Sequence, residues 1–315
     1  MAKGMENYME RYHPIVNFIY FAMVLGFGMF LVHPVCVCLS LAGAVCYTLY
    51  LFGWQEAKKS FAGLLVIMVL TAAINPAFNH QGVTVITYLP TGNVLTLESI
   101  LYGIGAAGML AGVLLWFRCM SKIMTSDKIV YLFGKGFPVL GLLLSMILGF
   151  IPKMQKKLRE IRLARDIDWQ EDISAKETAH GLKAAGRDIA KRLERVKYGI
   201  ENISILVTWA LEDAAQTADS MKSRGYGLIG RTSFTTYRFL KRDVRMSMLL
   251  IMEFIYILIG KINGDIYWTY YPGMDGNGWN PYSVSLYFVY MLLMFTPVMV
   301  GFCEERKWNK LQSAI

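Results

Sequence analysis

Apolar segments long enough to cross a membrane as helices recur six times along this chain. A helix needs about 20 apolar residues to cross roughly 30 Å of hydrocarbon. The six expected crossings are residues 15–32, 34–53, 61–78, 94–117, 245–260 and 282–302. The composition agrees, because 55% hydrophobic residues and a mean hydropathy of +0.39 exceed the values of an ordinary soluble domain. We predict an all-α integral membrane protein with about six transmembrane helices, five at the fewest and seven at the most.

The placement of Lys and Arg predicts which connections face the cytoplasm. Basic residues gather at the N-terminus and in residues 58–59, 118–128, 153–245 and 306–310. The connections 79–93 and 263–282 contain neither Lys nor Arg. Because cytoplasmic loops carry the excess of basic residues, we expect both termini in the cytoplasm and these two connections outside.

A further apolar stretch, residues 137–150, decides the number of crossings. It is short for a crossing and fits a re-entrant or interfacial segment equally well. A crossing there would place the basic segment 118–128 outside, against the positive-inside rule. Six crossings are therefore the preferred interpretation.

The long polar block after residue 152 predicts a separate domain, since it is far longer than a connecting loop needs to be. We expect N-terminal transmembrane helices in 1–152, cytoplasmic coupling helices in 153–244, and C-terminal transmembrane helices with a cytoplasmic tail in 245–315. The net charge of +9 follows largely from the basic inner face and from attraction to the anionic lipid bilayer. It argues little for a nucleic-acid partner.

Two helices of the polar block are expected to end near an arginine. Pro152 suits the first turn of one helix, which is expected to end near Arg165. Possible capping boxes at Asp168–Glu171 and Ser174–Glu177 predict a break within residues 166–173, after which the chain resumes as helix.

The other arginine follows an alanine-rich helical segment. Helix formers run from Leu211 to Arg224, and Gly225 suits the left-handed position that ends a helix. Lys222 and Arg224 then lie on the last turn, where cations are favourable beside the free carbonyls. Arg224 is predicted to project from a defined helix tip.

An amphipathic basic helix is expected between these two arginines. It combines an apolar stripe with basic residues that repeat every four positions on another face. The stripe consists of Leu182, Ala185, Ile189, Leu193, Val196 and Ile200, and the basic residues are Lys183, Arg187, Lys191 and Arg195. A solvated face and contact with lipid phosphate or an acidic partner groove explain these basic residues equally well.

Motifs for catalysis and for metal binding are missing from the sequence. The chain has no G-x-x-x-x-G-K-[ST] phosphate loop, no G-x-S-x-G elbow and no H-E-x-x-H pair, and its four histidines are scattered. We expect this chain neither to hydrolyse ATP nor to hold a metal or another cofactor. Glu253 is the deepest ionisable residue of the expected crossings. A carboxylate at that depth is functional by default, with an interhelical hydrogen bond as its main alternative role.

Four sequence features together resemble one family of membrane proteins. They are Asn75-Pro76 followed by His80-Gln81-Gly82, the segment Thr96-Leu97-Glu98-Ser99-Ile100-Leu101-Tyr102-Gly103, Phe150-Ile151-Pro152 before a basic helix, and the two arginine-tipped helices. With these features the chain resembles, over nearly its whole length, the T component of energy-coupling factor (ECF) transporters, the CbiQ/EcfT family. That family has Ala-Arg-Gly at both helix tips. This chain has Ala164-Arg165-Asp166 and Ser223-Arg224-Gly225, so its first tip lacks the glycine.

The resemblance implies a scaffold for ATP-driven uptake across the plasma membrane of a bacterium or archaeon. A small membrane S component would bind the transported micronutrient, a vitamin or a transition-metal ion such as cobalt or nickel. The ATPases would bind the ATP, so this chain would be a non-catalytic subunit without a cofactor of its own. Two cytoplasmic ABC-type ATPase subunits would dock on Ala164, Arg165, Ser223, Arg224 and Gly225.

Three other functions are compatible with the sequence. A permease subunit of another ABC-type transporter would present a short coupling loop, and the length of the polar block argues against it. A membrane-embedded lipid-modifying enzyme would need a cluster of Asp or His, but the acidic run 166–172 contains neither histidine nor a D-x-x-D repeat. A membrane scaffold without a transport role is the third alternative. The substrate stays open, because in this family the S component selects it.

Overall fold

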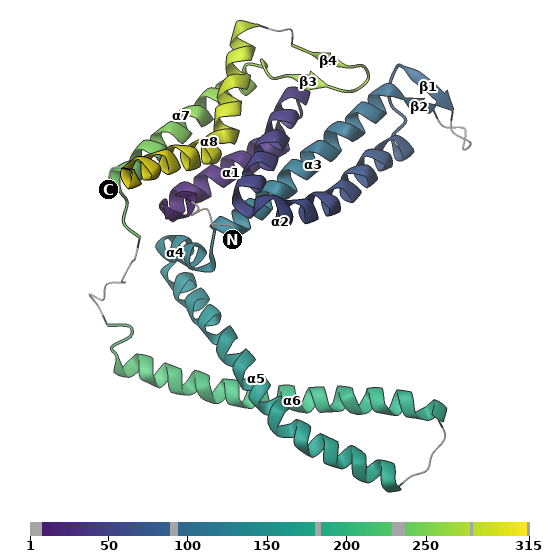
Figure 1. Ribbon diagram of the computed structural model, residues 1–315, viewed down its shortest axis with the longest axis vertical. Helices are drawn as coiled ribbons and strands as arrows, with labels where there is room; N and C mark the ends of the chain where they lie inside the picture. Colours follow the sequence, from purple (N-terminus) through teal and green to yellow (C-terminus); the bar gives the residue numbers. More distant parts are fainter. Residues whose placement is uncertain (1–7, 89–93, 180–183, 229–236, 278–279, 314–315) are drawn as a thin grey trace. The chain divides into compact units, whose positions relative to one another are not determined.

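Figure 1 shows the computed structural model, which describes residues 8–88, 94–179, 184–228, 237–277 and 280–313. The chain forms two compact units. The first combines Met1–Ile129 with Tyr237–Ile315, and the second is Val130–Thr236. The second unit thus begins at Val130, whereas the predicted coupling domain begins at residue 153.

Helices make up most of both units. The first unit contains the 3-10 helix η1 (Tyr8–Arg11) and the helices α1 (Pro14–Phe30), α2 (Pro34–Phe78), α3 (Leu97–Ile123), α7 (Lys241–Ile262) and α8 (Pro281–Gln312). Helix α4 (Ser126–Gly136) lies across the division, and the second unit contains α5 (Pro138–Ala179) and α6 (Ala184–Ser223).

Two small antiparallel hairpins accompany the helices, at the two connections that lack basic residues. One pairs β1 (Val85–Tyr88) with β2 (Val94–Thr96), and the other pairs β3 (Trp268–Thr269) with β4 (Asp275–Gly276). The fold is therefore mainly helical, as predicted, but it is not purely α.

Four helical segments are long and apolar enough to cross a membrane, by length and composition: Pro34–Phe78, Leu97–Ile123, Val139–Arg165 and Pro281–Gln312. Helix α1 is apolar but shorter, with 17 residues. The six predicted crossings lie mostly in helices, but 94–117 begins in strand β2 and 15–32 extends past the end of α1. Helix α7, which contains residues 245–260, is not among these four, and Val139–Arg165 is not among the six predicted crossings. The chain is thus a helical protein with helices that are long and apolar enough to span a membrane. The number and direction of its crossings stay predictions.

The predicted crossings 34–53 and 61–78 are two arms of one long helix, α2. The arms meet at Gly53, whose φ of 73° and ψ of 170° are not helical. A positive φ is costly for residues with a Cβ but not for glycine. Gly53 therefore lets the chain turn between the two apolar arms.

Aromatic side chains from several helices form the core of the first unit. Trp116 of α3 is fully buried, and the rings of Tyr20 and Tyr47 lie 6.1 and 6.0 Å from it between centroids. Close helix approach requires glycine at Gly260 of α7, where a Cβ would lie 2.4 Å from Leu286 Cδ1. Small residues that admit close packing are typical of helix contacts within membranes.

Histidine begins both of the first two helices. The Nδ1 of His13 accepts a hydrogen bond from the Ile15 N–H at 3.3 Å, and the Nδ1 of His33 accepts one from the Val35 N–H at 3.3 Å. Each histidine is followed by a proline, which suits the first turn of a helix. The histidines that look scattered in sequence therefore include two side-chain caps.

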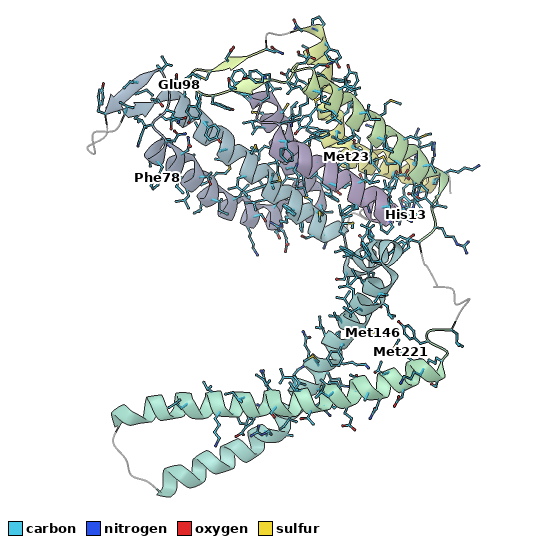
Figure 2. All side chains as sticks on the ribbon, turned by 180° about the vertical axis from the view of Figure 1, so that it is seen from behind. His13, Met23, Phe78, Glu98, Met146 and Met221 are labelled. Atoms are coloured by element: carbon cyan, nitrogen blue, oxygen red, sulfur yellow. The ribbon has the colours of Figure 1, made fainter. Side chains whose placement is uncertain are left out.

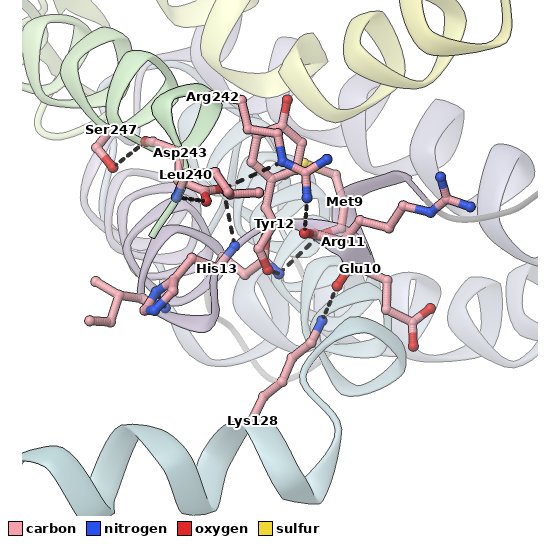
Figure 3. Close-up of polar contacts among 12 residues, drawn as sticks. Met9, Glu10, Arg11, Tyr12, His13, Lys128, Leu240, Arg242, Asp243 and Ser247 are labelled. Carbon is pink, nitrogen blue, oxygen red and sulfur yellow. Dashed lines mark hydrogen bonds and ion pairs between the residues drawn. The ribbon is translucent and has the colours of Figure 1, made fainter. Parts of the chain in front are cut away.

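A cluster of polar contacts joins η1, α3, α7 and the starts of α1 and α4 (Figure 3). The buried Asp243 carboxylate accepts hydrogen bonds from the N–H of His13 at 3.3 Å and of Leu240 at 2.8 Å. The buried Lys128 amine donates to the carbonyls of Glu10 at 2.7 Å and Ile123 at 3.1 Å. Both side chains satisfy backbone groups at helix ends, which have no partner within their own helix.

Two predictions about the start of the polar block are wrong. Helix α5 is continuous from Pro138 to Ala179, so Pro152 lies inside the helix and not in its first turn, and no break occurs at 166–173. Residues 138–150 belong to the same helix, and whether this stretch crosses the membrane stays a prediction. Pro152 removes one backbone hydrogen bond and favours a bend, but helix formers continue on both sides of it. A capping box marks a possible helix start without forcing one.

The His33 cap predicts a pH-dependent stability. Burial lowers the pKa of His33 from its ordinary value of 6.5, so below that value the unfolded chain takes up its proton before the folded chain does. Stability is therefore complete above about pH 7 and falls as the pH drops through 6.5 towards the lowered pKa of the folded state. Protonation also removes Nδ1 as an acceptor for the Val35 N–H.

We expect the melting temperature of the detergent-solubilised protein to fall over this range, and to fall less in His33→Asn, whose side-chain oxygen still caps a helix. His80→Asn, which changes a histidine that caps no helix, should keep the wild-type slope. Equal slopes for His33→Asn and wild type would contradict the prediction.

Candidate functional site

The predicted docking residues lie in α5 and at the end of α6: Ala164 and Arg165 belong to α5, Ser223 is the last residue of α6, and Arg224 and Gly225 follow it. The two helices pack against each other in antiparallel fashion. The rings of Phe150 and Trp209 stack with centroids 6.0 Å apart, and Lys153 Nζ lies 3.7 Å from Asp213 Oδ2. Further along α5 the contacts move back along α6, until Arg165 meets Glu201. Figure 1 shows the two helices crossing.

Arg165 lies inside this helix pair and is held by three side chains of α6. Its Nη1 donates to Asn202 Oδ1 at 2.8 Å, and its Nη2 pairs with the Glu201 carboxylate. Its guanidinium also lies 4.7 Å from the centroid of the Tyr198 ring. Asn202 is only 3% exposed, so the contact fixes the register of the two helices.

The expectation that Arg165 lies near a helix end is wrong, because α5 continues to Ala179. Ala164 is exposed on the same stretch of helix. The side chain of Asp166 lies outside the described residues. A docking role of Ala164 and Arg165 stays a prediction, and the structure adds that the Arg165 guanidinium already binds α6.

Sequence reasoning missed the partners of Arg165. Glu201 and Asn202 lie 36 and 37 residues away from it, and only the register of the helix pair brings them together. A polar residue within an apolar run is often buried with a partner. Asn202 gave no such signal, because the charged Glu201 stands directly beside it.

The end of α6 has the predicted form. The helix ends at Ser223, and Gly225 has a φ of 75°. The Gly225 N–H donates to the Lys222 carbonyl and the Tyr226 N–H to the Met221 carbonyl, both at 3.0 Å. This pair of hydrogen bonds is the Schellman motif, in which a left-handed residue satisfies the last carbonyls of a helix. The glycine thus fixes the direction in which the chain leaves α6.

Arg224 occupies the position just before this glycine and is exposed. Within the described part of the chain its side chain has no hydrogen-bond or ionic partner. The neighbouring Ser223 hydroxyl donates to the Ser220 carbonyl at 2.9 Å, so it adds to the cap. Figure 2 shows this end of α6 near the labelled Met221. The two predicted arginines therefore differ: Arg165 is engaged within the fold, and Arg224 is available to a partner.

Helix α6 also carries an exposed apolar stripe. Its members recur every three or four residues, which places them on one face. That face lies roughly opposite the buried Asn202 and Leu206, which face α5. The stripe consists of Leu193, Val196, Ile200, Ile203, Val207 and Leu211. Of the basic residues predicted beside it, Lys183, Arg187, Lys191 and Arg195 lie outside the described side chains.

In the first unit, two of the motifs behind the family resemblance contact each other. Asn75 Nδ2 donates to the Ser99 carbonyl at 2.7 Å, and Thr96 Oγ1 donates to the Gln81 carbonyl at 2.8 Å. Gly82 has a φ of 143°, and a Cβ there would lie 2.6 Å from Glu98 Oε2. These residues shape the start of α3 against the end of α2.

Glu253 of α7 has a buried Oε2 without a hydrogen-bond partner among the described residues. The described residues contain no group of three or more His, Cys, Asp or Glu side chains that could hold a metal ion.

No protein-family model matches this chain, and no curated protein sequence matches it either. The assignment of docking residues therefore depends on their geometry and on the sequence features described above.

The cap at Gly225 predicts opposite effects of alanine at two glycines of the second unit. Gly225→Ala forces a Cβ into the left-handed region, 3.0 Å from Leu228 Cδ1, and should weaken the helix end by about 1 kcal/mol. Gly199→Ala, inside α6 with open space around it, should stabilise the helix by roughly 0.5–1 kcal/mol. Hydrogen exchange of peptides covering 195–228 measures both effects, and equal signs would refute the assignment of the cap.

The contact between Arg165 and Glu201 predicts a measurable coupling. The two side chains are 25% and 45% exposed, so solvent weakens their attraction, and a double-mutant cycle to alanine should give roughly 0.5–1 kcal/mol. The more exposed pair Lys307–Glu304 of α8 should give a value near zero. Thermal unfolding in detergent measures both cycles, and zero coupling at Arg165 would show that this contact does not hold the helices together.

Proposed function

We propose that this chain is the transmembrane scaffold, the T component, of an ECF-type ABC importer. It couples ATP hydrolysis by two cytoplasmic ATPase subunits to the uptake of a micronutrient, which a small membrane S component binds. The observation that carries the proposal is the end of α6. There an exposed arginine, Arg224, follows a helix of 40 residues whose end is fixed by Gly225.

The chemistry of arginine suits this role. Its planar guanidinium makes several charge-assisted hydrogen bonds to carboxylates or exposed carbonyls at once. An acidic groove on an ATPase subunit is therefore a fitting partner for Arg224. Because the Schellman motif holds the backbone, the arginine is presented from a defined direction and loses little freedom on binding.

The contacts between α5 and α6 support a mechanical role. Stacking of Phe150 on Trp209 and the contacts of Arg165 join the two helices at separate points along their length. A displacement of Arg224 by the ATPases would move α6, and these contacts would pass the movement to α5 as a rigid body. Arg165 thus contributes to coupling by holding the helix pair together.

The apolar stripe of α6 supports an additional protein partner. Contiguous exposed apolar surface marks interaction sites, and this stripe lies on the face that α5 leaves uncovered. A small, very hydrophobic S component fits such a surface. Its movement with α6 would release the bound micronutrient towards the cytoplasm.

A permease subunit of another ABC-type transporter is the alternative. It would present a short coupling loop to its ATPases, whereas α5 and α6 have 42 and 40 residues. The length of this helix pair favours the T component. The proposed location is the plasma membrane of a bacterium or archaeon, with the coupling helices of residues 153–244 and both termini in the cytoplasm and no catalytic role for the chain itself.

Affinity purification tests the proposal. The tagged full-length chain is purified in mild detergent from its own cells, as wild type, Arg224→Glu and Arg159→Glu, and co-purifying proteins are quantified by mass spectrometry. Arg159 is an exposed cation of α5, so its variant matches the charge change. We expect two ABC-type ATPases and a small hydrophobic protein with wild type and Arg159→Glu, and at least about tenfold less ATPase with Arg224→Glu.

Two results would contradict the proposal. Wild-type protein that purifies without an ATPase would return the enzyme and scaffold alternatives to consideration. Undiminished ATPase with Arg224→Glu would remove Arg224 from the docking site.

A further inference from the structure

A basic-aromatic patch, consisting of Phe52, Trp54, Lys58, Arg118 and Lys122, lies where the first arm of α2 meets the end of α3. The Arg118 guanidinium lies 4.3 Å and the Lys122 amine 6.0 Å from the centroid of the Phe52 ring. The Lys58 amine lies 5.0 Å from the Trp54 ring, which is 62% exposed. All three distances allow cation–π attraction, which fixes the cations near the aromatic rings.

The cations of this patch have no acidic partner in the part of the chain that the structure describes. One carboxylate, Glu56, lies nearby in sequence. It sits in the first turn after Gly53, where the start of the second arm of α2 favours a negative charge. The patch therefore keeps a net positive charge that a ligand could neutralise.

The patch lies where apolar surface ends on two helices. On α3 the exposed Leu114 and Phe117 come directly before Arg118. On α2 the apolar first arm ends at Phe52, and the second apolar arm begins only at residue 61. Exposed tryptophan beside Lys and Arg at the end of apolar segments is typical of the boundary between hydrocarbon and headgroups.

The apolar part of a third helix, α8, ends near the same boundary. Tyr50, one turn before Gly53, donates a hydrogen bond to Glu305 Oε1 of α8 at 3.1 Å. Gly301 packs so closely against Tyr50 that a Cβ would lie 2.5 Å from its hydroxyl. The apolar part of α8 is therefore also followed by charged residues close to Gly53, where α2 is kinked.

We propose that the basic-aromatic patch binds the headgroup of an anionic phospholipid. The phosphate accepts hydrogen bonds from Arg118 and Lys122, Lys58 adds a third positive charge, and the Trp54 ring lies at headgroup depth. The acyl chains run along the exposed apolar faces of α2 and α3. This site does not depend on the proposed transport function, because it uses only the first unit and the membrane around it.

Thermal unfolding of the full-length chain in detergent tests the site. The probes are phosphatidylglycerol, phosphatidylcholine with the same acyl chains, and inorganic phosphate. We expect phosphatidylglycerol to raise the melting temperature of wild type by roughly 3 °C or more and phosphatidylcholine to have little effect. In Arg118→Gln/Lys122→Gln the midpoint lipid concentration should rise about tenfold.

A matched variant, Lys307→Gln/Lys310→Gln, removes the same charge from α8 and should respond like wild type. Lys58→Gln, a milder change at an exposed residue, should give an intermediate response and keeps the test valid if the double variant does not fold. Equal shifts with both lipids, or an unchanged response of the patch variants, would overturn the proposal. An equal shift with inorganic phosphate would replace the lipid site with a simple anion site.

Discussion

Inside a bilayer no water reaches the backbone, so every N–H and C=O has to be paired within the protein. The four helical segments that are long and apolar enough to cross a membrane meet this constraint by their own hydrogen bonds. Several breaks in the helical backbone of the described residues lie where the apolar sequence stops. Gly53 interrupts α2 beside Trp54 and Lys58, and the two hairpins occupy connections between apolar helices.

The same constraint explains where the buried polar side chains of the first unit lie. Asp243 and Lys128 bind backbone groups at the ends of helices, and His13, His33 and Thr96 cap the starts of α1, α2 and α3. Each of these side chains takes the place of a hydrogen bond that the helix cannot make itself. These buried polar side chains therefore have a structural role, which is to pair backbone groups at helix ends.

The two predicted docking arginines show how environment changes the meaning of a motif. Both follow a small residue in the sequence, yet Arg165 is bound by Asn202, Glu201 and Tyr198, whereas Arg224 is exposed at a capped end. The missing glycine accounts for the difference. Gly225 ends α6 with a left-handed residue, but Asp166 offers no such residue and α5 continues past it. A binding surface that uses both arginines equally would therefore require Arg165 to leave its present partners.

The sequence by itself determined the helical class, the six apolar segments and the end of α6, because hydrophobic length and the backbone freedom of glycine act locally. It placed Arg224 on a helix tip for the same reason. Only the tertiary structure decided that α5 runs through Pro152 and residues 166–173, since a cap or a proline permits a helix end without requiring one. The partners of Arg165 and the meeting of Phe52 with Arg118 likewise depend on how distant helices pack, and no local pattern encodes which residues that packing brings into contact.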